Sequence, residues 1–228
     1  MNQLLTRHET FNLIRRLKAS GLSWLYDPEK HRITIDTDAT VEENIRIRLP
    51  VNFPHIDHEK DQDEDEESIG YIIILIQAGK AAVGYFDDDI IVDHKVFKSY
   101  MVRKKQGKSQ VKYLKSKGKS RAGSRVRLAN TIHFFESINE RLQEYFEDYE
   151  INRIGLSCSK TLLPYLFSSK VSCPFDKKDE RLFKIPRHIH TPGYDILIDT
   201  QEWLLQGEIK YSEQLQPLVD SLINGNDS

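Results

Sequence analysis

The sequence predicts an α/β fold in which helices pack on a mixed β-sheet, with a small α+β extension at the N-terminus. Three apolar segments between residues 71 and 103, separated by tight turns, predict an antiparallel meander. A long amphipathic helical pattern follows at residues 128–146. Beyond it, strand-like and helix-like segments alternate as far as residue 205, which is typical of one α/β domain with a mixed sheet.

The first 56 residues carry the patterns of a small α+β unit. Apolar residues at helical spacing predict a helix over residues 4–17, and Gly21 is a suitable stop. Alternating apolar and polar residues predict strands at residues 31–36 and 44–49. We therefore expect one helix and two strands before the main sheet.

The meander is expected to begin with a strand at residues 71–77, which reads Tyr-Ile-Ile-Ile-Leu-Ile-Gln. A continuous apolar run of this kind is typical of a central strand that is buried on both faces. A second strand is expected at residues 80–86, after the turn at Ala78-Gly79. A third begins at residues 90–93 and is expected to continue through residues 100–103.

The helix predicted over residues 128–146 places its apolar side chains on one face, so we expect Phe134 and Phe135 to pack in the core. After this helix we expect a strand at 152–158, a short helix capped by Ser159, a strand at 181–185 and a helix at 195–205.

The composition is that of a rather polar globular protein, with 39% hydrophobic and 30% charged residues among 228. Its longest apolar run is too short to cross a bilayer, for which about 20 residues are needed. The first residues show no signal-peptide pattern, so we expect a cytoplasmic protein without a membrane partner. Cys158 and Cys173 are not spaced as a metal pair and are expected to be core thiols, with a disulfide between them left open.

Positive charge is concentrated in one segment of an otherwise balanced chain. The formal net charge is −2, yet residues 95–127 contain thirteen Lys and Arg residues and no Asp or Glu. Cations at this density repel one another and are usually stabilised by a polyanion. The alternative is a lysine-rich exposed loop that has no partner. The segment therefore predicts a nucleic-acid contact in a loop over residues 103–127.

The middle of this basic loop carries small and amide side chains. Gly107 permits close approach of the backbone to another molecule. Gln110 offers a hydrogen-bond donor and an acceptor without a charge. An amide in this setting is suited to positioning a water molecule or a hydroxyl group beside phosphates, and it is not suited to acting as a base.

Two spaced motifs give this segment a wider context. The first is His94-Lys95-x-Phe97-x-x-Tyr100-x-Val102-Arg103-x-Lys105-Gln106-Gly107-x-Ser109-Gln110, and the second is Ala122-Gly123-Ser124-x-x-Arg127-x-x-Asn130. With the segment from Phe183-Lys-Ile-Pro186 through Pro192, they resemble the Vms-like release-factor domain over about residues 70–205. That domain is related to the catalytic middle domain of eukaryotic and archaeal class-I release factors.

The resemblance implies a middle-domain-like fold and a role in ribosome quality control. Members of the family enter a large ribosomal subunit that carries an obstructed peptidyl-tRNA and free the nascent chain. They are described as cleaving near the tRNA 3′ end or hydrolysing the peptidyl ester, and both routes need an oriented oxygen nucleophile. The glutamine that the family needs maps onto Gln110, with Gly107 and Ser109 in its loop. No cofactor and no metal are implied.

Phosphates of tRNA and ribosomal RNA are the ligands expected for the basic side chains around this glutamine. The expected contacts are Arg103, Lys104, Lys105, Lys108, Lys112, Arg125 and Arg127.

The sequence departs from the family pattern at two positions. Lys108 stands where a second glycine is common, which makes the backbone less permissive and adds a cation. Leu128 stands where the second of two arginines is common. The zinc finger, ankyrin repeats and segregase-binding helix of eukaryotic members have no counterpart here, so the chain resembles stand-alone prokaryotic members.

Two other functions remain open from the sequence. One is a tRNA- or ribosome-binding module without catalysis. The other is a metal-dependent ribonuclease that uses the three aspartates at residues 87–89, although consecutive aspartates point in different directions and are common in turns. The histidine pairs His55/His58 and His188/His190 lack a third ligand at suitable spacing and are expected to be surface residues.

The expected domain organisation has four parts. These are an α+β extension at residues 1–56, an acidic loop at 57–68, a release-factor-like catalytic domain at 69–206, and a C-terminal tail at 207–228.

Overall fold

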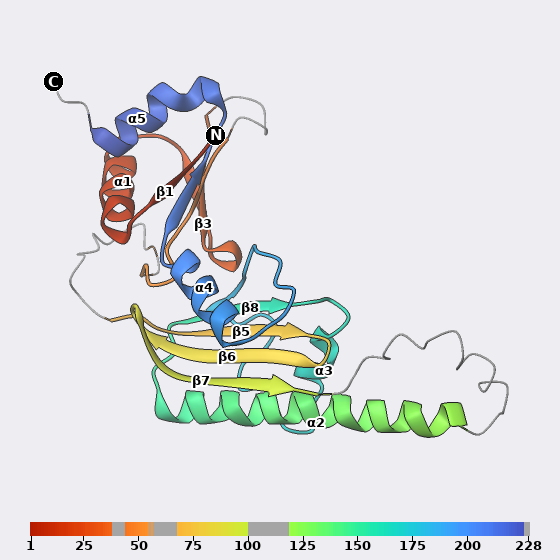
Figure 1. The fold of residues 1–228 in the computed structure, drawn as a ribbon. Coiled ribbons are helices and arrows are strands. Elements are labelled where there is room, and N and C mark those ends of the chain that lie inside the picture. The colour runs from red at the N-terminus through yellow and green to blue at the C-terminus, as the bar shows by residue number, and fades with distance from the viewer. Residues whose placement is uncertain (38–43, 55, 57–67, 100–118, 226–228) are drawn as a thin grey trace.

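The computed structural model describes the chain except for residues 38–43, 55, 57–67, 100–118 and 226–228, and only the backbone of residues 119–127. The described residues form an α/β structure with two five-stranded sheets (Figure 1). This architecture agrees with the fold class expected from the sequence, including a small α+β part and a mixed main sheet.

The first sheet is antiparallel throughout and is built from both ends of the chain. In spatial order its strands are β1 (Asn2–Leu5), β10 (Gly207–Lys210), β4 (Ile45–Arg48), β3 (Arg32–Ile35) and β2 (Trp24–Asp27). A single 3₁₀ turn, η1 (Pro28–Lys30), joins β2 to β3. Helices α1 (Arg7–Ala19) and α5 (Gln216–Asn224) cover one face of this sheet (Figure 1).

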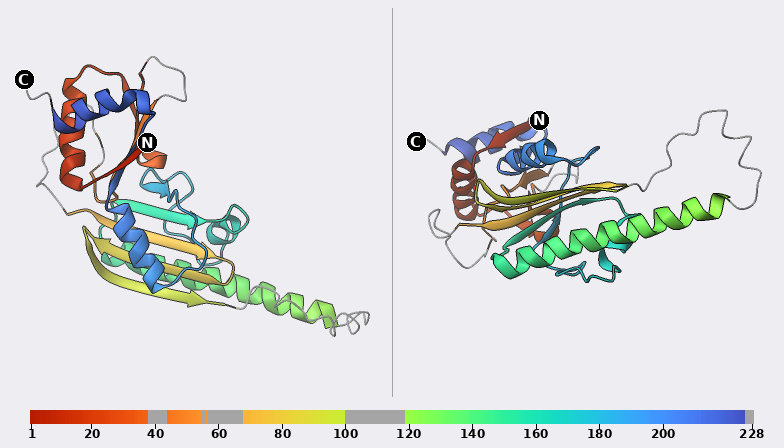
Figure 2. Two further views of the ribbon diagram at one scale, coloured as in Figure 1. Left: turned by 45° about the horizontal axis from the view of Figure 1, so that its top comes forward. Right: turned by 60° about the horizontal axis from the view of Figure 1, so that its bottom comes forward.

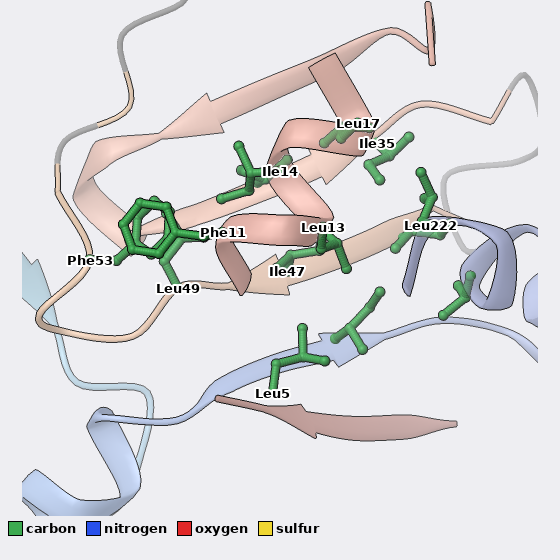
Figure 3. Packing of buried hydrophobic residues seen from close by; sticks show 14 of the residues in the cluster. Leu5, Phe11, Leu13, Ile14, Leu17, Ile35, Ile47, Leu49, Phe53 and Leu222 are labelled. Atoms are coloured by element: carbon green, nitrogen blue, oxygen red, sulfur yellow. The ribbon is translucent and has the colours of Figure 1, made fainter. Parts of the chain in front are cut away.

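The core of this first layer lies between the sheet and its two helices. Figure 3 shows Leu13 of α1, Ile47 of β4 and Leu222 of α5 meeting in one cluster. Helix α1 starts at Arg7, because Thr6 accepts from the backbone N–H of Glu9 while the Glu9 side chain accepts from Thr6, forming a capping box. The sequence prediction placed this helix from residue 4, where the structure has β1.

Residues 207–224 form part of the first layer, and the expectation of a tail from residue 207 does not hold for them. Strand β10 lies between β1 and β4, and α5 follows a 3₁₀ turn, η4 (Glu213–Leu215). Val219 and Leu222 of α5 are buried against the first core. The pattern Gly-Glu-Ile-Lys is too short to predict a strand by itself, because its pairing comes entirely from distant segments of the chain.

The second sheet is mixed, as the sequence predicts. In spatial order its strands are β7 (Ile90–Lys98), β6 (Lys80–Asp87), β5 (Gly70–Gln77), β8 (Arg153–Cys158) and β9 (Leu182–Lys184). Strands β5, β6 and β7 form the expected antiparallel meander, whereas β5, β8 and β9 run parallel. Gly79 makes the β5–β6 turn with φ of +79°, a conformation that glycine adopts at little cost.

Helices cover both faces of this second sheet (Figures 1 and 2). Helices α2 (Lys119–Asp148) and α3 (Leu163–Phe167) lie on one face, and α4 (Tyr194–Leu204) lies on the other. The side chains of β5 alternate between the two cores, with Ile72 and Ile74 toward α2 and Tyr71 and Ile73 toward α4. The continuous apolar run of this strand is therefore explained by burial on both sides.

Two helix starts differ from the sequence prediction. Helix α2 begins at Lys119, nine residues before the predicted start at 128, because its first turns carry no apolar stripe that periodicity could reveal. The prediction of a loop over residues 103–127 is therefore wrong for residues 119–127, which are helical. Helix α3 begins at Leu163, and the backbone carbonyl of Ser159 accepts from the N–H groups of Leu162 and Leu163. Phe134 and Phe135 are buried, as expected.

The two layers share a polar junction and belong to one folded unit. Arg153 of β8 is buried, and its guanidinium donates to the carbonyl of Phe53 at 3.4 Å and to the hydroxyl of Tyr26 at 3.3 Å. The N–H of Val51 donates to the carbonyl of Leu204 at 2.8 Å. Burial lowers the pKa of Arg153, while Tyr26 opposes this shift.

Candidate functional site

The basic loop leaves the second sheet at the end of β7, where Ser99 fixes its base. The N–H of Ser99 donates to the carbonyl of Gly79 at 2.8 Å, and its hydroxyl donates to the carbonyl of Asn130 at 3.2 Å. The first contact joins β7 to the β5–β6 turn, and the second joins it to α2. Eleven residues of α2, from 119 to 129, precede this second contact, which at 1.5 Å per residue is about 16 Å of helix.

The side chains of helix α2 are more exposed near its N-terminus than in its C-terminal half. Leu128 and Ile132 are 53% and 38% exposed, whereas Phe134 and Phe135 are 4% and 1% exposed. Figure 2 shows the N-terminal part of the helix extending beyond the ends of the strands of the second sheet. The helix is thus packed on the sheet from about Phe134 onward, and its earlier turns form an arm that returns the basic loop to the body.

The packed half of α2 is held to β7 by an ion pair. The guanidinium of Arg141 lies 3.0 Å from the carboxylate of Asp93 and 2.9 Å from that of Glu144. The same guanidinium stands 5.6 Å from the ring centroid of Tyr145. Burial raises the pKa of Tyr145 above its usual range, and the charge of Asp93 acts in the same direction, so this phenol is neutral near pH 7.

Asn139 connects α2 to the segment that carries α3. This side chain is fully buried, and its amide donates to the carbonyls of Leu166 and Val171 at 2.9 and 2.8 Å. One turn further on, the amide of Gln143 donates to the carbonyl of Ser172 at 2.8 Å. The support of the arm is therefore a specific set of polar contacts in addition to apolar packing.

Most of the predicted site residues lie outside the described part of the chain. These are Arg103, Lys104, Lys105, Gly107, Lys108, Ser109, Gln110 and Lys112. Arg125 and Arg127 belong to the projecting turns of α2, for which the backbone is described. The described residues thus supply the two ends of the loop, Ser99 and the start of α2, and the assignments within the loop stay predictions.

The three aspartates at residues 87–89 form the β6–β7 turn and are engaged by protein groups. Asp88 has φ of +50°, and its carboxylate accepts from the N–H of Ile69 at 3.1 Å and lies 3.5 Å from the guanidinium of Arg7. The Tyr71 hydroxyl donates to the carbonyl of Asp88 at 2.6 Å, and the Gln201 amide donates to that of Asp89 at 3.1 Å. These contacts assign a structural role to the turn.

The histidines and cysteines offer no metal site within the described residues, where no group of three His, Cys, Asp or Glu side chains could hold an ion. His188 and His190 are exposed, with ring centroids 4.3 Å apart, while His55 and His58 lie outside the described residues. Cys158 and Cys173 are free, partly buried thiols beside the core under α2. Burial raises the pKa of Cys158 to about 12 and that of Cys173 to about 11.

Comparison with known proteins decides the family. The profile of the family described as "Bacteroidetes VLRF1 release factor" matches residues 71–212, which is more than half of the chain. The chain belongs to this release factor family. The matched segment runs from the second residue of β5 to just beyond β10, so it contains the second sheet except Gly70, together with the basic loop and α4. Membership places the protein among release factors of translation, for which interaction with tRNA and the ribosome is implied.

Other comparisons add little to this membership. Among solved structures, one described as "Vms1 mitochondrial localization core" is similar, with 13% sequence identity and a TM-score of 0.41, covering 90% of this chain and 82% of that chain. No curated protein matches the sequence. Within the described residues, no helix has the length and apolar character that crossing a membrane requires.

Sequence reasoning missed the residues that hold the base of the loop. Ser99 and Arg141 carry no motif that would distinguish them from ordinary polar residues. Asn130 did appear in the second spaced motif, and the structure assigns its backbone carbonyl a role as the acceptor for Ser99.

Proposed function

We propose that this release factor frees nascent chains from obstructed peptidyl-tRNA on the large ribosomal subunit, in the cytoplasm, as part of ribosome quality control. The observation that supports the proposal most strongly is the family match over residues 71–212, which includes the glutamine-containing basic loop. The geometry of the loop base is consistent with it, since a loop fixed at Ser99 and carried back by a projecting helix is suited to reaching into a cleft of a large partner.

In this proposal Gln110 orients the oxygen that attacks the scissile bond. An amide can donate to one oxygen and accept from another without introducing a charge among phosphates. Gly107 and Ser109 would allow the loop backbone to approach the tRNA 3′ end closely. The bond that breaks is either the peptidyl ester or a phosphodiester near that end, and both reactions gain most from an oriented nucleophile.

The cations around Gln110 would hold RNA phosphates and so position the loop. The proposed contacts are Arg103, Lys104, Lys105, Lys108, Lys112, Arg125 and Arg127. Lys108, in place of a common glycine, adds a phosphate contact in this scheme. Residues 69–206 are proposed as the catalytic domain, with residues 207–224 assigned to the first layer.

A second candidate function is a tRNA- or ribosome-binding module without catalysis. The substitutions at Lys108 and Leu128 favour it, because both change positions close to the proposed catalytic loop. Leu128 is 53% exposed, so burial in the core does not explain its apolar side chain.

The test uses large ribosomal subunits that carry a labelled, obstructed peptidyl-tRNA. Wild-type protein and Gln110→Ala are added in parallel, and the products are resolved on a gel. Release by wild type alone is the expected result, and the state of the tRNA 3′ end identifies the broken bond. Equal release by both proteins would reject the role of Gln110. Binding of wild type without release would leave the binding module as the function.

A further inference from the structure

The outer face of the first sheet carries a basic pocket that the family match does not explain. Ile33, Ile47 and Ile209 point into the core under α1 and α5, so the alternate residues of β3, β4 and β10 lie on the opposite face. A cavity of about 460 Å³ lies on that face. Its charged lining residues are Glu29, Lys30, Arg32, Arg46, Arg48, Lys184, Glu208 and Lys210. We call this cavity the outer-face pocket.

Cations exceed carboxylates in the outer-face pocket even when neighbouring ion pairs are included. The lining contains six Lys or Arg residues and two Glu residues. Asp27, next to the pocket, pairs with Lys30 at 2.6 Å and stands 3.9 Å from Arg32. Counting this third carboxylate, the excess is three positive charges, since six minus three is three.

The excess is concentrated on Arg46 and Lys184. Glu208 is shared, at 3.1 Å from Lys210 and 3.8 Å from Arg48. Neither Arg46 nor Lys184 makes an ion pair with any residue in the described part of the chain, and both are exposed. The pocket therefore presents two accessible cations whose charges the described protein groups leave uncompensated.

Arg48 supplies a buried positive charge beneath these residues. Its side chain is 8% exposed, its guanidinium carbon lies 3.9 Å from the ring centroid of Trp203, and Nη2 donates to the Trp203 carbonyl at 3.4 Å. Its Nε and Nη1 atoms have no hydrogen-bond acceptor among the described residues. Burial lowers the pKa of Arg48 to about 10, with Glu208 opposing the shift, so the charge is retained at neutral pH. A cation in a setting of low polarity increases the positive potential at the pocket.

A neighbouring cavity shows that this excess is a local property. A cavity of about 610 Å³ shares Glu29 and Lys184 with the outer-face pocket and is also lined by Lys160, Lys177, Lys178, Asp179 and Glu180. Its four lysines and three carboxylates nearly balance. The positive excess is thus confined to the side formed by the first sheet.

We propose that the outer-face pocket binds phosphate groups of an RNA backbone and gives the protein a second RNA contact, in addition to the basic loop. The inference rests on the proposed function, which supplies RNA as the surrounding polyanion. Six cations spread over the η1 turn, strands β3, β4 and β10, and β9 can serve more than one phosphate, as a nucleic-acid backbone requires.

The position of the pocket points to a large RNA. The first sheet and the free end of α2 lie at opposite ends of the molecule in each view (Figures 1 and 2). Helix α2 alone, with 30 residues, is about 45 Å long at 1.5 Å per residue. An RNA of the size of tRNA or ribosomal RNA is long enough to reach from the first sheet to the free end of α2.

The test measures binding of full-length protein to fluorescently labelled tRNA by anisotropy over a range of salt concentrations. The test variant combines Arg46→Glu with Lys184→Glu, and Arg46→Gln with Lys184→Gln repeats the test with a milder change. The control combines Arg15→Glu with Lys170→Glu, which makes the same change in net charge at exposed sites away from both basic regions. Circular dichroism and thermal unfolding verify the fold of each variant.

We expect the test variant to bind tRNA about tenfold more weakly or worse, and the slope of log affinity against log salt to fall by about two. The control should match wild type within about twofold. Equal weakening of test and control variants would overturn the proposal, because it would show an effect of net charge alone. Binding of inorganic pyrophosphate as tightly as tRNA, lost in the test variant, would also overturn it, because the pocket would then serve a small phosphate compound.

Gln110→Ala separates this inference from the proposed function. It should bind tRNA like wild type while losing release. If Gln110→Ala still releases nascent chains but the Arg46/Lys184 variant binds weakly, the catalytic proposal fails and the outer-face pocket stands. If Gln110→Ala loses release but the Arg46/Lys184 variant binds tRNA like wild type, the pocket is rejected and the catalytic proposal stands.

Discussion

The two sheets differ in how their faces are used. The second sheet is covered by α2 and α3 on one face and by α4 on the other, so its central strand β5 is buried on both sides. The first sheet is covered by α1 and α5 on one face only, and its other face carries charged residues. A doubly covered sheet can offer function only at its edges and strand ends, where the basic loop leaves. A singly covered sheet can bind a ligand on its open face.

The largest expected effect concerns whether the two layers unfold together. Leu142→Ala in the core under α2 and Leu13→Ala in the core under α1 each remove a fully buried side chain. Each should lower the free energy of unfolding by about 2–5 kcal/mol. Both should keep one transition in calorimetry, because β10 returns to the first sheet after the second is complete. Two separate transitions in Leu13→Ala would show that the layers are independent.

A smaller loss is expected for the polar support of the arm. Asn139→Ala leaves the carbonyls of Leu166 and Val171 without their donor, which should cost about 1–3 kcal/mol. Gln143→Ala is the matched control, since its bond to Ser172 is exposed to solvent. Urea denaturation should show no more than a few tenths of a kcal/mol for this control. Equal effects of the two substitutions would contradict the assigned role of Asn139.

The ion pair between β7 and α2 should contribute less. Asp93 and Arg141 are partly exposed, with side chains 35% and 26% accessible, and such pairs are typically worth about 0.2–1 kcal/mol. A double-mutant cycle with Asp93→Asn and Arg141→Gln measures their coupling in the folded protein. The coupling should shrink as salt is added, and a salt-independent value would mean that packing of Arg141 on Tyr145 dominates.

The smallest effect is on thiol chemistry. The folded-state pKa of Cys158, about 12, lies above the ordinary value of 9, so the neutral thiol stabilises the fold fully below about pH 9, and this contribution is lost as pH rises toward 12. Iodoacetamide at pH 8 should therefore label Cys158 at least about a hundredfold more slowly in folded protein than in urea. Mass spectrometry of the modified peptide follows the rate. Equal labelling rates in both states would contradict burial of this thiol.

Local patterns predicted the second sheet better than the first. In β5 and in the amphipathic half of α2, the pattern of apolar residues along the sequence predicts which side chains are buried. Strand β10 has four residues and acquires its partners, β1 and β4, from the far end of the chain. The projecting turns of α2 have no apolar stripe, because no core lies beside them, so helical periodicity was absent there.

The two candidate sites also differ in how far the sequence could predict them. The basic loop is contiguous in sequence, so charge counting and the family resemblance could both find it. The outer-face pocket is assembled from Arg32, Arg46, Lys184 and Lys210, which meet only after β3, β4 and β10 pair and β9 is brought beside them. No spacing along the chain could indicate that arrangement.

We assign chemistry to the basic loop and RNA binding to the outer-face pocket. The most direct test of this assignment is the release rate as a function of protein concentration, measured on large subunits with obstructed peptidyl-tRNA. For Gln110→Ala we predict a maximum rate reduced by about a hundredfold or more at an unchanged half-saturating concentration. For the Arg46→Glu and Lys184→Glu double variant we predict an unchanged maximum at a higher half-saturating concentration. A maximum rate that Gln110→Ala retains would contradict the account, since Gln110 would then have no part in the chemistry.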